Sequence, residues 1–299
     1  MPPSINKFAH WLLPNKGVES LRKIKRWVAH VKRDLSPKLD ADTFLNILKG
    51  PLALKKGDTV FIHSAAAKLN LSFPLEHVFP LIFDIIGPQG TVLVPAYPKL
   101  PSHEYVKTDP LFDVNSDRSY MGALTEILRT DPRTKRSLHP TKSVCAQGAL
   151  ADEFTRDHHT DILPYGRQSP YYRAIEAKAV AIGLGVNPKY LSLVHSVDDT
   201  MGKDYPVDPY LPEAFRIRCL DWQGRDCQVE TLVHDPAKML HDVPAFLSRC
   251  VNPDIYLMTE IAGREFFRID TAALFTEMVR LAKQGETIYP PSIYRMRAP

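Results

Sequence analysis

Cysteine is scarce in this chain of 299 residues, and its spacing excludes two common small-protein scaffolds. The four cysteines are Cys145, Cys219, Cys227 and Cys250, and no two of them form a CxxC pair. Disulfide-stapled secreted domains have a higher density of cysteines, and zinc ribbons need CxxC pairs. The sequence therefore predicts reduced thiols in a cytosolic protein.

Long hydrophobic runs are also missing. The longest apolar-rich stretches, residues 60–67 and 180–184, have the length of buried strands and fall short of the roughly 18 residues of a membrane-spanning helix. Residues 1–10 lack the basic start, apolar centre and cleavage site of a signal peptide. Because 44% of the residues are hydrophobic, we expect a folded protein with a sizeable core. The lack of long apolar runs and of a signal peptide predicts that it is cytoplasmic and has no transmembrane segment.

Common signatures of nucleotide binding and hydrolysis are absent too. No GxGxxG or P-loop follows a predicted strand, and neither GxSxG nor HExxH occurs. His158, His159 and Asp161 carry metal-ligating atoms, but no further ligand accompanies these adjacent histidines at an established spacing. We interpret this segment as a polar loop and expect no metal site.

Positive charge is concentrated at the N-terminus. Residues 1–38 hold nine Lys or Arg against two acidic residues, whereas the remainder holds 29 basic and 32 acidic residues. Apolar residues recur there at steps of three or four, as on one face of a helix: Val18, Leu21, Ile24, Val28, Val31 and Leu35. We predict a basic amphipathic arm that docks on its own domain, with contact to an anionic membrane surface as the second use of such a helix. Nucleic-acid binding is disfavoured because the arm has few aromatic residues and the rest of the chain is net acidic.

Alternating strand and helix patterns predict one α/β domain over residues 39–299. Buried-strand patterns at 59–64 and 91–95 flank a helical run at 75–86, which is a β-α-β unit and favours a parallel sheet covered by helices. Further strands are expected at 143–146 and 179–184, a hairpin at 216–232, and further helices at 40–48, 120–130 and 272–283. The predicted fold is a central mixed, largely parallel sheet with helices on it.

Three histidines follow apolar segments and are candidates for one cleft, namely His63, His139 and His195. Ligand crevices form at strand ends in such sheets. A neutral imidazole, with an ordinary pKa near ~6.5, suits a general base at neutral pH when a carboxylate fixes its tautomer. Each histidine taken alone also fits a structural role.

Seven motifs together resemble the aminoglycoside 3-N-acetyltransferase family, which has the antibiotic N-acetyltransferase fold, over residues 40–299. They are Phe61-Ile62-His63-Ser64-Ala65, Gly87-Pro88-Gln89-Gly90-Thr91, Met121-Gly122, Arg136-Ser137-Leu138-His139-Pro140, Gly166-Arg167-Gln168-Ser169-Pro170, Gly183-Leu184-Gly185 and Leu193-Val194-His195. The resemblance implies a single α/β domain that transfers acetyl directly from acetyl-coenzyme A to an amine.

The resemblance also implies roles for individual residues. His195 matches the family's general base, and Asp235 stands where the family places a supporting acid, with Asp198 as the alternative. The cofactor-binding positions are His63, Ser64 and Ala65 at a strand end, Arg136, Ser137 and His139 along the coenzyme A channel, and Ser169. Backbone N–H groups at the strand-to-helix turn after Ser64 would suit the pyrophosphate.

The acceptor amine is less constrained than the donor. In the loop after Tyr97, Glu104 and Asp113 are the candidate substrate-binding carboxylates, but several basic residues accompany them, so the loop is not strongly acidic. An aminoglycoside-like polycation and an amino sugar carried on a nucleotide or lipid phosphate both stay open as acceptors. A non-catalytic scaffold that binds coenzyme A or a partner is the alternative to an enzyme, and the oligomeric state is open.

Overall fold

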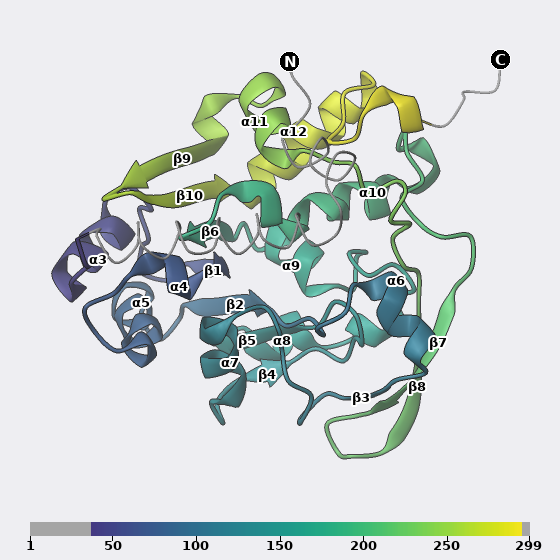
Figure 1. The fold of residues 1–299 in the computed structure, drawn as a ribbon, viewed down its shortest axis with the longest axis horizontal. Helices are drawn as coiled ribbons and strands as arrows, with labels where there is room; N and C mark the ends of the chain where they lie inside the picture. Colours follow the sequence, from purple (N-terminus) through teal and green to yellow (C-terminus); the bar gives the residue numbers. More distant parts are fainter. Residues whose placement is uncertain (1–36, 295–299) are drawn as a thin grey trace, which may run out of the picture.

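A central sheet of seven strands organises the computed structural model, which describes residues 37–294 (Figure 1). Its strand order is β4-β5-β2-β1-β6-β10-β9. The strands are β1 (Thr59–Ser64), β2 (Thr91–Pro95), β4 (Lys135–Arg136), β5 (Val144–Gly148), β6 (Val180–Leu184), β9 (Tyr256–Ile261) and β10 (Arg264–Asp270). The α-helices are α3 (Ala41–Lys49), α4 (Ala66–Leu69), α5 (Val78–Ile86), α6 (Ser102–Tyr105), α7 (Ala123–Thr130), α8 (Ala151–Thr155), α9 (Pro170–Glu176), α10 (His195–Met201), α11 (Val243–Cys250) and α12 (Thr271–Lys283).

The sheet is mixed, as predicted, but the expectation of a largely parallel sheet is wrong. Only β1 pairs in parallel, with β2 on one side and β6 on the other. The remaining pairs, β2 with β5, β5 with β4, β6 with β10 and β10 with β9, are antiparallel. The short turn between β9 and β10 explains one of these pairs, because a parallel neighbour needs a long crossover and a tight hairpin cannot provide one.

Alternating side chains along the strands build two cores, one on each face of the sheet. Val60 and Ile62 face the core that α3, α5 and α7 cover, whereas Phe61 faces the core that α8 to α12 cover. Successive side chains of a strand point to opposite faces, so a strand buried on both sides is apolar throughout. That is why the buried-strand pattern at 59–64 locates the centre of the sheet.

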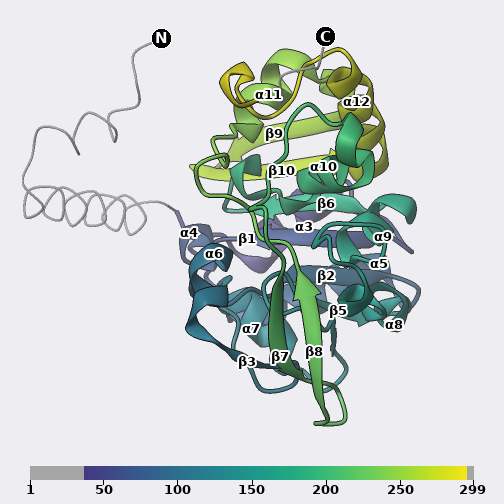
Figure 2. The ribbon, with the colours of Figure 1, turned by 90° about the vertical axis from the view of Figure 1, so that its right-hand side faces the viewer.

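The predicted hairpin is present but belongs to a separate small sheet. Strands β7 (Phe215–Leu220) and β8 (Asp226–Thr231) pair in an antiparallel way, and β3 (Leu111–Asp113) adds to β7 in parallel. This unit projects below the main sheet in Figure 2. Its own small core is formed by Phe112, Val114, Leu138, Ile217, Cys219 and Val229.

Several local expectations are confirmed. Asp40 caps α3 by accepting the Thr43 N–H at 2.7 Å, and all four cysteines are free thiols. The predicted basic arm, residues 1–38, lies outside the described residues except for its last two positions. Among the described helices, none is long and apolar enough to cross a membrane.

Candidate active site

A pocket of about 690 Å³ opens where β1 and β2 end. It is lined by residues 62–68 at the end of β1, Pro95 and Tyr97 after β2, residues 120–123 and Thr125 at the start of α7, Lys142, Tyr165, Val186, residues 189–192, His195, His234, Met239 and His241. Both strands deliver their carboxyl ends to this edge, which is where open α/β sheets bind ligands. A pocket of this size accommodates a small-molecule ligand.

His195 stands on the pocket wall as the first residue of α10. Its Nδ1 lies 3.1 Å from Oδ2 of Asp198, one helical turn further along. The Tyr289 hydroxyl donates to the same carboxylate oxygen at 2.8 Å. Residues three apart on a helix share a face, so the helix itself places the acid beside the histidine. Because only Nδ1 has a partner among the described residues, Nε2 is left for a ligand in the pocket.

Asp198, and not Asp235, is the acidic residue in contact with His195. The Asp235 carboxylate accepts the Ala237 N–H at 2.9 Å and lies 3.9 Å from the Lys238 ammonium. No hydrogen bond joins it to His195 within residues 37–294. Its neighbour His234 enters the pocket instead, because the irregular segment after β8 turns the histidine inward.

Aromatic rings surround His195. The ring of His234 lies 4.6 Å from it, that of Tyr165 5.2 Å and that of His241 5.3 Å, measured between centroids. Burial, with further repulsion from neighbouring cations, lowers the pKa of His234 well below its usual range, and burial lowers the pKa of His241 to about 4. Both rings are therefore neutral at pH 7 and add no charge beside His195.

A second acidic residue, Asp199, forms hydrogen bonds with two tyrosines near this ring cluster. Asp199 accepts the Tyr165 N–H at 2.8 Å and the Tyr210 hydroxyl at 2.6 Å. Tyr210 in turn stacks on His234 with ring centroids 4.8 Å apart. Burial raises the pKa of Asp199 well above its usual range. Asp198 and Asp199 thus have different partners, the first His195 and the second Tyr165 and Tyr210.

The predicted strand-end residues His63, Ser64 and Ala65 all line the pocket. His63 is 4% exposed, and burial lowers its pKa to about 4. Its Nε2 has no hydrogen-bond partner among the described residues. A buried polar atom is normally paired, so this nitrogen is suited to a ligand's polar group.

Four other predicted cofactor-binding residues lie away from the pocket, and the structure gives them protein partners instead. The Arg136 guanidinium donates to the carbonyls of Ala96, Asp117 and Val114 and to Ser143 Oγ. The donors of Arg136 thus already meet protein acceptors. Ser169 caps α9 by accepting the Tyr172 N–H at 3.1 Å.

Ser137 and His139 are buried beside the site and do not line the pocket. Ser137 Oγ lies 2.9 Å from Nδ1 of His158, whose ring stacks on that of His139 at 4.4 Å. His139 Nδ1 accepts the Lys142 N–H at 3.1 Å, so it shapes the turn that carries Lys142 into the pocket. His158 is fully buried, which corrects the expectation of a polar loop at that position.

The predicted acceptor carboxylates are also elsewhere. Glu104 lies on α6 with its carboxylate 3.7 Å from His103. Asp113, at the end of β3, accepts the Asn115 N–H at 2.9 Å and the Ser116 hydroxyl at 2.6 Å. Neither lines the pocket.

His195, Asp198 and His234 are near enough for one ligand atom from each to lie within 4.8 Å of the others. Such a cluster can hold a metal ion. However, Asp198 Oδ2 already accepts the Tyr289 hydroxyl and faces His195 Nδ1, an arrangement that favours a proton-transfer pair.

The fold resembles solved aminoglycoside acetyltransferases. The crystal structure of aminoglycoside acetyltransferase AAC(3)-Xa aligns with a TM-score of 0.71 at 21% identity and covers 89% of this chain and 99% of that one. AAC-IIIb in its binary complex with CoASH aligns with a TM-score of 0.68 at 23% identity over 85% of this chain and 100% of that one. The protein thus has the fold of these acetyltransferases.

Sequence comparison narrows this class to one family. The family model for aminoglycoside 3-N-acetyltransferase matches residues 61–281, and the chain belongs to this family. Aminoglycoside N(3)-acetyltransferase VII of Streptomyces paromomycinus is 30% identical over 172 residues, 52% of this chain and 59% of that protein. Aminoglycoside N(3)-acetyltransferase III of Acinetobacter baumannii is 26% identical over 158 residues, 48% of this chain and 55% of that protein. The matches therefore span little more than half the length of these curated relatives.

Proposed function

We propose that this protein is an acetyl-coenzyme A-dependent N-acetyltransferase that acts on a small-molecule amine. The observation that carries the proposal is the His195–Asp198 pair, hydrogen-bonded at 3.1 Å on the wall of the 690 Å³ pocket. A buried histidine oriented by a carboxylate is the arrangement that general-base catalysis needs. The family and the relative bound to CoASH support coenzyme A as the donor's carrier.

The pocket has features that suit acetyl-coenzyme A. The turn after β1, the first turn of α7 and the exposed ammonium groups of Lys68 and Lys189 all border it. Backbone N–H groups and lysines together suit the phosphates of the donor. The unpaired Nε2 of His63 offers a further hydrogen bond deeper in the pocket. Acetyl-coenzyme A supplies the activated acetyl thioester.

His195 then performs the proton transfer. An amine that is mostly protonated at pH 7 must lose its ammonium proton before its lone pair can attack. Nε2 of His195 accepts this proton, and the free amine then attacks the thioester carbonyl, so that the new C–N bond forms and the C–S bond breaks. The coenzyme A sulfur leaves with the electron pair of that bond and takes up the second proton, which the nitrogen loses as it becomes an amide, while His195 passes its own proton to water. Asp198 holds the ring through Nδ1 and stabilises the imidazolium that forms.

A non-catalytic scaffold that binds coenzyme A is the competing function. A scaffold has no need for a carboxylate that is 4% exposed and pairs with a pocket histidine, since burying such a group is costly.

The deciding experiment uses the full chain with acetyl-coenzyme A and a panel of amines that includes sisomicin and amino sugars. Release of free thiol, dependent on an amine and lost in His195→Ala, is the expected result. Binding of acetyl-coenzyme A without thiol release from any amine would favour the scaffold.

A further inference from the structure

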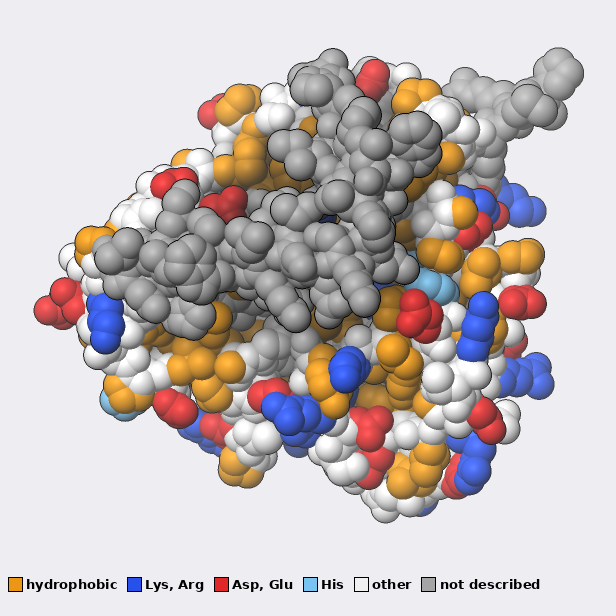
Figure 3. Space-filling view, viewed as in Figure 1, with side chains coloured by type: hydrophobic (Ala, Val, Ile, Leu, Met, Phe, Trp, Pro, Cys, Tyr) orange, Lys and Arg blue, Asp and Glu red, His pale blue; other side chains and the backbone are white. Residues whose placement is uncertain are grey.

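The pocket is lined by cations and neutral rings, and its described lining contains no carboxylate. It includes the three lysines Lys68, Lys142 and Lys189 and four histidines, but no Asp or Glu. On the outer surface, by contrast, acidic and basic side chains are interspersed, as the lower part of Figure 3 shows. Because the pocket lining has lysines and no carboxylate, a polyammonium ligand would enter this pocket without carboxylate partners and against positive charge.

Lys142 is the cation that lies deepest. It is half-buried, and its ammonium lies 4.7 Å from the ring centre of Tyr97 and 5.9 Å from that of Tyr165. No acidic side chain within residues 37–294 forms an ion pair with it. Burial lowers the pKa of Lys142 to about 8, so most of it is still charged at pH 7. A half-buried ammonium without a carboxylate is costly unless a ligand supplies the negative charge.

The backbone holds Lys142 firmly in this position. Its N–H donates to His139 Nδ1 at 3.1 Å, and its carbonyl accepts the Tyr171 hydroxyl at 3.1 Å. Tyr171 also lies 2.6 Å from the Tyr97 hydroxyl, so one network fixes both the lysine and the ring beneath its ammonium. A preorganised cation is what specific anion binding requires.

The phosphates of coenzyme A do not account for this charge. Tyr165 contacts both Lys142 and His195, so the ammonium lies one ring away from the proposed base. The pantetheine arm separates the thioester, which must lie at His195, from the phosphates. In the proposed complex these phosphates lie at the outer lysines Lys68 and Lys189, which leaves Lys142 for the acceptor.

We propose that the acceptor amine carries an anionic group such as a phosphate ester, and that Lys142 binds this group. The proposal rests on the proposed function for its donor and its base. Such an acceptor has a net negative or neutral charge, in contrast to a polycationic aminoglycoside. The charge-assisted bond to Lys142 would orient the amine toward Nε2 of His195.

The test compares amines that differ only in the anion. Glucosamine with glucosamine 6-phosphate, and ethanolamine with phosphoethanolamine, form two matched pairs, and sisomicin represents the polycations. Calorimetry measures the binding of each amine to the coenzyme A complex of the full chain, and thiol release measures kcat/KM. We expect at least one phosphorylated amine to bind tenfold or more tightly than its partner and to exceed sisomicin in kcat/KM.

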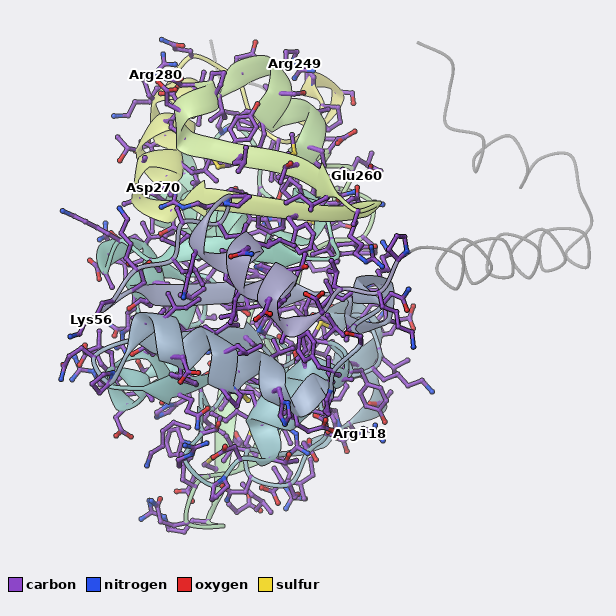
Figure 4. The ribbon with its side chains drawn as sticks, turned by 90° about the vertical axis from the view of Figure 1, so that its left-hand side faces the viewer. Lys56, Arg118, Arg249, Glu260, Asp270 and Arg280 are labelled. Atoms are coloured by element: carbon purple, nitrogen blue, oxygen red, sulfur yellow. The ribbon has the colours of Figure 1, made fainter. Side chains whose placement is uncertain are left out.

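Charge variants assign the effect to Lys142. Lys142→Met should remove the preference for the phosphorylated amine, whereas Lys142→Arg should keep much of it because the positive charge stays. Lys56→Met is the matched control, since Lys56 is exposed, precedes β1 at the opposite end from the pocket, and points away from the fold in Figure 4. It should retain the preference in full.

The outcomes separate this proposal from the general function. Equal or weaker binding of both phosphorylated amines, a preference for sisomicin, or an unchanged preference in Lys142→Met would each overturn the anionic acceptor and leave the acetyltransferase activity standing. Tight binding of a phosphorylated amine that needs Lys142, with no thiol released from any amine, would instead support the anion site and refute the proposed reaction.

Discussion

The hydroxyl of Tyr289 donates a 2.8 Å hydrogen bond to Asp198 Oδ2, the same oxygen that lies 3.1 Å from His195 Nδ1. The carboxylate therefore has two donors converging on one atom, which fixes its rotamer and directs its charge at the imidazole. With Nδ1–H donating to Asp198, the tautomer of His195 carries its lone pair on Nε2. This tautomer thus directs the lone pair of Nε2 into the pocket.

Replacing His195 by alanine tests the base directly. General-base catalysis contributes typically ~10² to 10⁴ in rate, so we expect His195→Ala to lose about that much in kcat. Acetyl-coenzyme A affinity should be nearly retained, because the lysines proposed to bind the donor's phosphates, Lys68 and Lys189, are not altered. Turnover is measured per folded molecule, with the folded fraction taken from thermal unfolding. A variant that turns over normally once corrected for folding would rule out His195 as the base.

The two candidate acids allow a matched comparison. Asp198→Asn should lower kcat by ~10-fold or more, because the amide cannot stabilise the imidazolium and can reverse the tautomer. Asp235→Asn removes an equal charge from a carboxylate that contacts only its own turn and Lys238, so kcat should change little. The measurement is thiol release at saturating acetyl-coenzyme A and amine. Loss of activity in Asp235→Asn but not in Asp198→Asn would show that Asp235 is the acid that supports His195, as the sequence resemblance implies.

The sequence alone predicts the elements at the centre of the fold well. The strands at 59–64 and 91–95 are correct to the residue because both faces of each are buried, which leaves unbroken apolar runs. Gly87 follows α5 with φ of 68°, and it marks the helix end because glycine adopts a positive φ without steric cost. The pair of His195 and Asp198 is also local, since it depends only on helical spacing.

Contacts between residues that are far apart in the sequence could not be predicted from local patterns. Tyr289 reaches Asp198 from 91 positions away, and nothing around it in the sequence indicates a catalytic neighbour. Arg136 looks like a phosphate ligand because sequence cannot show the backbone carbonyls that surround it. The half-buried position of Lys142 has one sequence signal, its place two residues after the His139-Pro140 pair, but its inward direction comes from the turn that His139 closes.

The structural role of Arg136 leads to a stability prediction. Arg136→Met leaves the carbonyl of Asp117 and other buried acceptors without their donor, so we expect a loss of about 2 to 4 kcal/mol in the free energy of unfolding. Lys135→Met, on the same strand but exposed and 3.5 Å from Asp152, should change it by no more than ~0.5 kcal/mol. Urea unfolding measures both. Unchanged stability in Arg136→Met together with weaker acetyl-coenzyme A binding would restore the phosphate role.

The buried histidines predict a loss of stability in acid. Ser137 Oγ lies 2.9 Å from Nδ1 of His158, while Nε2 of this ring lies 3.0 Å from the Pro164 carbonyl, so the neutral ring satisfies both partners. Burial lowers the pKa of His158 to about 3. Between the two pKa values, the unfolded chain, in which the pKa is near ~6.5, binds a proton on this histidine and the folded chain does not. Folding stability from this residue is complete above that value and is lost as the pH falls toward the folded pKa.

We therefore expect the free energy of unfolding of the wild type to fall as the pH drops from about 6.5 to 4, with His158 contributing a slope of about 1.4 kcal/mol per pH unit. His158→Asn should start from a lower stability at pH 7, since it breaks one or both hydrogen bonds, but its slope between these pH values should be smaller by about one proton. Urea unfolding across this range gives both quantities. Parallel pH curves for the two proteins would show that His158 is protonated equally in the folded and unfolded states, and the neutral, buried ring described above would then be wrong.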